Sequence, residues 1–211
     1  MNASLKETVD RLPGGLLITD LDSQVLYASA ALERRTGFAV AEIVGKKPGE
    51  LWGGRMRKQF YGTLWHTIGS ERQSFVGEVH NTRKNGATHD EHIFILPIHD
   101  REGVTRYFAE VHPELTTRES ELDFAREFLS RTRGSVQDAP FFTWMFSRIA
   151  TKEDGTLSSY TTLSSEPLLD PATFVYESFI LPTEKLFERR RDDALLIARA
   201  KEDPEQFAAL Y

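Results

Sequence analysis

The sequence predicts an α+β fold in which a five-stranded antiparallel sheet carries helices on one face and is followed by a mainly helical C-terminal extension. The spacing of apolar residues changes from a helical period to an alternating one near residue 70. Asn85-Gly86, a strong hairpin signal, then separates two alternating runs. Two strands, a helical segment and a three-strand meander therefore follow one another, and such a sheet accommodates this order.

Each element of the first half has its own signal. Leu5, Val9 and Leu12 are spaced as on one helical face, and Pro13 ends that segment. Glycines end the two short helices that follow. The expected helices cover residues 5–12, 30–36, 39–44 and 55–68, with a loop over 46–54. The expected strands cover residues 16–19, 24–28, 74–82, 88–98 and 105–111.

The C-terminal half is expected to be mainly helical. Residues 116–133 have a helical pattern, with leucines recurring every seven residues as in a short coiled-coil seam, at Leu115, Leu122 and Leu129. The segment around Gly155 fits either a hairpin or a helix followed by a loop. Further helices are expected over residues 172–190, over 192–202 and from Pro204 onward.

Composition excludes several function classes. The 211 residues carry a formal net charge of −6, so we expect no nucleic-acid binding by this chain alone. There is no cysteine, which excludes disulfides, thiolate metal sites and cysteine nucleophiles. No apolar run approaches the ~20 residues of a membrane span, and the N-terminus lacks the apolar stretch of a signal peptide. We therefore expect a soluble, cytoplasmic protein without a membrane partner.

Six short motifs occur in a fixed order between residues 16 and 118. They are Val25–Ala31, Thr36–Phe38 with Glu42–Lys46, Gly53–Arg55 with Phe60–Trp65, Gly77–Gly86, Pro97–Gly103, and Glu114–Arg118. Their order and content resemble the PAS domains of bacterial sensor proteins. Ser29 stands where that family often has asparagine, and Glu114 stands where it usually has aspartate.

The resemblance implies a non-catalytic sensory module. It divides the chain into an N-terminal helical cap (1–15), a PAS sensory domain (16–116), a signalling helix (117–134) and a mixed, mainly helical region (135–211). Glu114, Thr116 and Arg118 would carry a conformational signal into that helix. Leu115, Leu122 and Leu129 would then form the seam of a homodimer or contact a signalling partner protein.

A ligand cavity is expected between the long helix and the sheet, and its ligand is unknown. Alternation along two strands and the apolar face of the helix give the candidate lining residues Phe60, Leu64, Phe75, Gly77, Val79, Ile93 and Ile95. These residues fit a filled core equally well.

Three cofactor classes are not expected. The absence of cysteine excludes a flavin that forms a thiol adduct. His66 lies on the helix that carries the axial ligand in haem-binding PAS domains, but it aligns with a polar surface position, so haem is not expected. His89 and His92, with Asp90 and Glu91 between them, alternate between two faces of a strand, so no metal site is expected there.

The chain shows no signature of a catalytic output. No nucleophile–base pair or phosphate-binding glycine loop is present, and no histidine follows His112, so we expect no enzyme. Residues 193–211 resemble the start of the polymerase-binding region of alternative sigma factors. The alternative function is therefore a sensory transcription regulator, truncated after Tyr211, with a PAS input.

Overall fold

A five-stranded antiparallel sheet forms the centre of the molecule. The computed structural model describes residues 4–134, 136–160, 163 and 170–202. The strands are β1 (Gly15–Thr19), β2 (Val25–Ala28), β3 (Phe75–Thr82), β4 (Thr88–His99) and β5 (Thr105–His112), in the order β2-β1-β5-β4-β3. The predicted sheet is confirmed, and β5, the last strand in the chain, is its central one.

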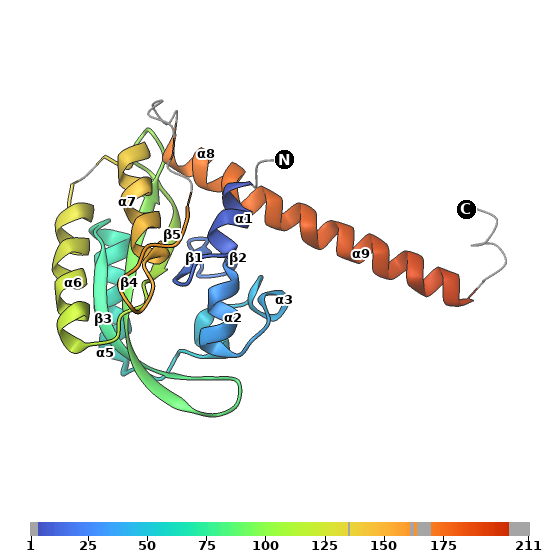
Figure 1. Cartoon of the computed structure of the whole chain (residues 1–211), viewed down its shortest axis with the longest axis horizontal. Coiled ribbons are helices and arrows are strands. Elements are labelled where there is room, and N and C mark those ends of the chain that lie inside the picture. The colour runs from blue at the N-terminus through green and yellow to red at the C-terminus, as the bar shows by residue number, and fades with distance from the viewer. Residues whose placement is uncertain (1–3, 135, 161–162, 164–169, 203–211) are drawn as a thin grey trace.

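The helices between β2 and β3 cover one face of the sheet, here called the inner face (Figure 1). They are α2 (Ala30–Thr36), α3 (Val40–Ile43), α4 (Pro48–Leu51), α5 (Lys58–Trp65) and the π-helix η1 (His66–Ser70). Gly37 ends α2 with φ of 77°, a conformation that glycine adopts without strain. The expected loop at 46–54 holds the turn of α4, and the long helix begins at Lys58 rather than residue 55.

The C-terminal extension covers the opposite, outer face of the sheet. It consists of α6 (Arg118–Thr132), α7 (Ala139–Ala150), α8 (Pro171–Val175) and the π-helix η2 (Tyr176–Ile180), joined by α1 (Leu5–Asp10) from the N-terminus. Together with the outward side chains of the strands they form the largest hydrophobic cluster. The mainly helical extension is confirmed, and the sheet lies between two helical layers.

Aromatic side chains hold this outer layer together. Phe94 of β4 packs edge-on against Phe124 and Phe128 of α6, with ring centroids 4.7 Å and 5.6 Å away. Phe142 of α7 is fully buried, and Tyr27 of β2 lies 5.0 Å from Phe179 of η2. Aromatic pairs at these distances add to the stabilisation from buried area.

Gly14, the residue before β1, lies so close to α7 and β5 that a larger side chain does not fit there. A Cβ atom at Gly14 would lie 2.8 Å from both the Ile149 Cα and the His112 oxygen. The Gly14 amide donates a 2.8 Å hydrogen bond to the Ile149 oxygen, which joins the segment before β1 to the extension. Substitution of Gly14 by any larger residue would separate the two layers.

The last helix projects away from the body (Figure 1). It is α9 (Leu181–Glu202), and it runs without a break through Arg191, where the sequence predicted two helices. Around Gly155 both sequence alternatives hold in part, since α7 precedes an antiparallel bridge between Thr151 and Leu157. The helix expected from Pro204 lies outside the described residues. Along the described chain, no helix combines the length and apolarity needed to cross a bilayer.

Candidate functional site

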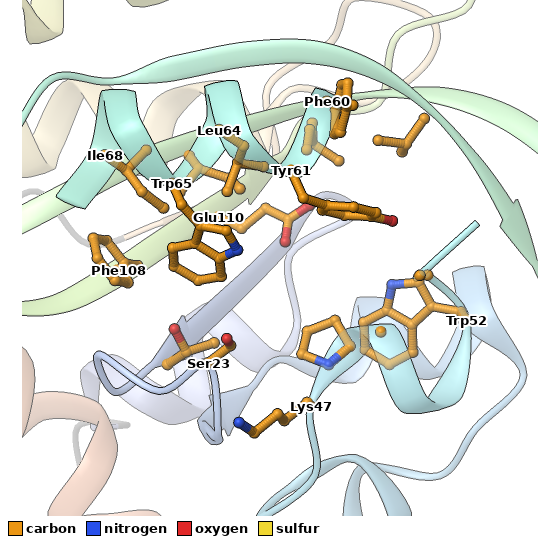
Figure 2. A pocket seen from close by; sticks show the side chains of 18 of the residues that line it. Ser23, Lys47, Trp52, Phe60, Tyr61, Leu64, Trp65, Ile68, Phe108 and Glu110 are labelled. Atoms are coloured by element: carbon orange, nitrogen blue, oxygen red, sulfur yellow. The ribbon is translucent and has the colours of Figure 1, made fainter. Parts of the chain in front are cut away.

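A cavity of about 280 Å³ lies between α5 and the inner face of the sheet; we call it the inner cavity (Figure 2). Its lining comes from α5, η1, the loop around α4 and strands β1, β3, β4 and β5. Most of the lining is apolar and a few polar groups face inward, as in many small-molecule sites.

Aromatic rings form much of the wall. Trp65 lies 5.9 Å from Phe108 across the cavity edge, and Phe60 packs edge-on against Tyr61 at 5.5 Å between ring centroids. Trp52, from the end of α4, lines the other side and is 4% exposed. Five aromatic side chains therefore surround a space large enough for a small organic molecule.

The structure brings most of the predicted lining residues together. Five of the seven candidates line the inner cavity: Phe60, Leu64, Val79, Ile93 and Ile95. Phe75 and Gly77 lie beside it instead. A Cβ atom at Gly77 would lie 2.6 Å from the Phe75 ring. The Phe75 ring therefore lies directly over Gly77 and separates it from the cavity.

Sequence reasoning missed the residues that give the cavity its chemical character. Asn81, Trp52, Tyr61, Trp65, Phe108 and Glu110 all line it. Alternation along β5 carries the missing signal, because Glu110 shares a face with Phe108 while Ala109 and Val111 face the other way. A charged residue at an inward position of a central strand indicates a polar group inside the cavity.

Glu110 occupies the middle of the sheet. It pairs with Leu17 of β1 on one side and with Ile95 of β4 on the other. Figure 2 shows its carboxyl turned into the space that Tyr61, Trp65 and Trp52 surround. Its side chain is 13% exposed, and that exposure faces the cavity.

A polar cluster lies next to Glu110 and is centred on Glu91 of β4; we call it the Glu91 cluster. Arg35 of α2 forms a 2.6 Å ion pair with one Glu91 oxygen, and the Asn81 amide donates a 2.6 Å hydrogen bond to the other. His89 Nε2 lies 3.3 Å from Glu91, and His112 Nδ1 lies 3.9 Å from it. His112 Nε2 also lies 3.3 Å from Glu110 Oε1, so His112 links the cluster to the cavity.

Burial and neighbouring charges give Glu110 and Glu91 very different pKa values. Burial, followed by the charge of Glu91, raises the pKa of the Glu110 carboxyl to about 8. Burial also favours a raised pKa for Glu91, but His112, Arg35 and Asn81 outweigh it and hold the pKa at about 2. Burial and then Arg35 lower the pKa of His112 to about 4. At neutral pH Glu91 is therefore ionised, whereas Glu110 and His112 are uncharged.

The histidines singled out in the sequence lie elsewhere. His66 has a side chain that is 67% exposed and lies 3.4 Å from Glu71, outside the cavity lining. His89 and Glu91 share a face of β4, as the alternation predicts, and His92 faces Glu121 of α6 at 3.1 Å. Among the described residues no group of three or more histidine or acidic side chains is arranged to hold a metal ion.

The residues expected to transmit a signal lie where β5 gives way to α6. Arg118, the first residue of α6, lies 3.5 Å from Glu78 of β3. Thr117 caps the helix with Ser120, and within the described chain the side chains of Glu114 and Thr116 make no hydrogen bond.

Leu122 and Leu129 lie on the side of α6 that faces away from the sheet, whereas Leu115 precedes the helix. Leu122 is 42% exposed and Leu129 is 43% exposed, whereas Leu115 is partly buried. The opposite side of the helix packs onto the sheet through Phe124 and Phe128. A surface of α6 is therefore accessible to another molecule.

Comparison with known proteins identifies the class of the N-terminal half. The PAS domain family matches residues 13–117, and these residues belong to that family. A nitrogen fixation regulatory protein of Klebsiella oxytoca is 23% identical over 108 residues, which are 51% of this chain and 22% of that protein. The chain thus spans about a fifth of the length of this relative. A light-oxygen-voltage (LOV) protein of Rhodobacter sphaeroides has the same fold, with a TM-score of 0.51 and 22% identity over 70% of this chain and 80% of that one.

The cofactor prediction requires a correction. Solved structures with this fold include LOV domains, and one of them, studied with a flavin analogue, has a TM-score of 0.44 and 21% identity over 54% of this chain and 85% of that one. The prediction that excluded a thiol-adduct flavin is therefore contradicted, because the LOV protein of Rhodobacter sphaeroides shares this fold. The aromatic walls and inward polar groups of the inner cavity fit a flat heteroaromatic ring.

Proposed function

We propose that this chain is a non-catalytic sensory module whose inner cavity binds a small organic ligand. The observation that carries the proposal is a cavity of about 280 Å³ with aromatic walls and one buried carboxyl, placed on the central strand of a PAS sheet. PAS domains are sensory modules, and the Klebsiella relative is a regulatory protein. Two ligand chemistries suit the lining: a flat heteroaromatic ring such as a flavin, and an organic cation.

The signal would leave through β5 and α6. Ligand binding would shift the population between two arrangements of sheet and helices. The change would pass through Glu114, Thr116 and Arg118 into α6, whose exposed Leu122 and Leu129 would contact a second copy or a signalling partner. An output through transcription, as the sigma-like pattern of residues 193–211 would imply, is the second candidate.

Native mass spectrometry of freshly purified protein, with an absorption spectrum of the same sample, tests ligand binding. We expect a retained small molecule in the wild type and its loss in Val79→Phe, because Val79 lines the inner cavity. Val76→Phe is the matched control, since Val76 lies on the same strand and packs against the outer core. Equal retention in both variants would place the ligand outside the inner cavity.

A further inference from the structure

We propose that the ligand of the inner cavity carries an organic cation, an ammonium group with alkyl or aryl substituents, held between the Glu110 carboxylate and the aromatic walls. The inference rests on the proposed function, because it names the chemistry of the ligand that the cavity binds. Three features of the cavity support it: the charges around Glu110, the aromatic lining, and the presence of an ionisable carboxyl on the central strand.

Among the described residues, an ionised Glu110 carboxylate has no charged ion-pair partner of opposite sign at neutral pH. Arg35 is paired with Glu91 at 2.6 Å, so the two charges of the Glu91 cluster already balance. His112, 3.3 Å from Glu110, is uncharged at neutral pH because burial lowers its pKa. Lys47 is the cation among the described lining residues, and Figure 2 shows it on the far side of the cavity beside Ser23, where it is exposed to solvent. A cationic ligand would supply the positive charge that stabilises Glu110 as a carboxylate.

The aromatic lining attracts positive charge independently of Glu110. A cation within ~6 Å of an aromatic ring centroid is attracted by the negative face of the ring, most strongly when both are removed from water. Tyr61, Trp65 and Trp52 surround the space into which the Glu110 carboxyl points, and Phe60 and Phe108 complete the wall. An ammonium group in this space meets rings on several sides and a carboxylate at the sheet.

A carboxyl at this position is unfavourable for the ligand-free fold. An uncharged ligand with an N–H or C=O edge would be recognised equally well by an amide or hydroxyl group, which remain neutral at any pH. Glu110 instead places an ionisable acid on a central strand, where burial and Glu91 oppose its charge. A carboxylate can form an ion pair with a cation, and a neutral side chain cannot. Of the ligand classes considered, a cation is therefore the one that benefits from an acid at this position.

Binding of a cation must then release a proton. In the ligand-free protein at pH 7 the Glu110 carboxyl holds a proton, because burial and the charge of Glu91 raise its pKa to about 8. A ligand cation favours the carboxylate, and the proton passes to solvent. The other ionisable or charged groups that face Glu110 are Arg35, Glu91, His112, Tyr61 and Lys47. The expected signature is release of up to one proton per ligand below pH 8.

Choline and its uncharged carbon analogue 3,3-dimethylbutan-1-ol test the inference, because they differ in charge and hardly in shape. We expect calorimetry at pH 7 to show choline binding about tenfold tighter or more. Titrations in two buffers with different ionisation enthalpies should show the released proton. Glu110→Gln should abolish the proton release and reduce the preference for choline to the part that the aromatic rings supply, whereas Glu50→Gln, at an exposed position on α4, should change neither.

Equal affinity for the two probes would overturn the cation inference while leaving a ligand-binding cavity in place. A preference for choline that is undiminished in Glu110→Gln would overturn the role of Glu110. If neither probe binds, the cation inference fails, and the retained-ligand measurement with Val79→Phe decides separately whether the cavity binds a ligand. Urea unfolding of Glu110→Gln at pH 7 verifies that the variant is folded.

Discussion

The substitution Glu110→Gln should change how the stability of this protein depends on pH. A carboxyl whose pKa rises from 4.5 to about 8 on folding is protonated in the folded state and ionised in the unfolded state throughout that interval. The folded state then binds more protons than the unfolded state, so the free energy of unfolding falls as the pH rises from 4.5 to about 8.

His112 opposes this trend over part of the range. Its pKa falls from 6.5 to about 4 on folding, so between these values the unfolded state binds the extra proton and stability rises with pH. The two effects cancel in large part up to pH 6.5, and Glu110 acts alone between pH 6.5 and about 8. At about 1.4 kcal/mol per pH unit, wild-type stability should fall by about 2 kcal/mol over that interval.

Urea unfolding at half-unit steps from pH 6 to 8.5 measures this fall. We expect the wild type to lose about 2 kcal/mol between pH 6.5 and 8 and Glu110→Gln to lose almost nothing, because glutamine carries no proton that titrates there. Glu50→Gln, exposed on α4, should follow the wild-type curve. Parallel curves for wild type and Glu110→Gln would refute the protonation state assigned to Glu110.

Three further predictions concern the helical layers and the Glu91 cluster. Phe128→Ala should lower the free energy of unfolding by ~3–5 kcal/mol, because the ring is fully buried against the sheet. Leu129 is 43% exposed, so Leu129→Ala should change the free energy of unfolding by less than ~0.5 kcal/mol. Similar losses for the two variants in urea titrations would contradict this orientation of α6. Leu122→Glu should convert a dimer to a monomer in light scattering, and a strict monomer before and after the change would disprove the seam. Arg35→Met should lower the free energy of unfolding by less than the ~3–5 kcal/mol expected for breaking a fully buried ion pair, because the Arg35 side chain is 33% exposed. An unchanged midpoint of urea unfolding would show that Glu91 needs no ion-pair partner.

Local sequence patterns are sufficient to predict the sheet. Each strand is short and alternating, and turns such as Asn85-Gly86 mark where the chain reverses. The predicted start of α5 was less accurate, because Arg57 has an extended backbone and the helix begins after it, at Lys58 rather than at residue 55. The packing of α6 and α7 on the outer face depends on long-range contacts that no local pattern encodes.

The site was predicted in outline and missed in its chemistry. Alternation on β3 and β4 identified Val79, Ile93 and Ile95, whose apolar side chains follow the usual rule for a buried face. The buried acid Glu110 departs from that rule and is recognised only once β5 is known to be the central strand. The grouping of Arg35 with Glu91 joins residues far apart in the sequence, and nothing local in either segment indicates it.

The position of β5 has a mechanical consequence. Glu110 faces the inner cavity, while its neighbours Ala109 and Val111 lie in the outer core next to α7. A single stretch of covalent backbone therefore has one row of side chains in each compartment. A displacement of this strand by a molecule on one side moves the opposite row by the same amount, without any relay through flexible connections. The central strand therefore connects the inner cavity directly to the outer core.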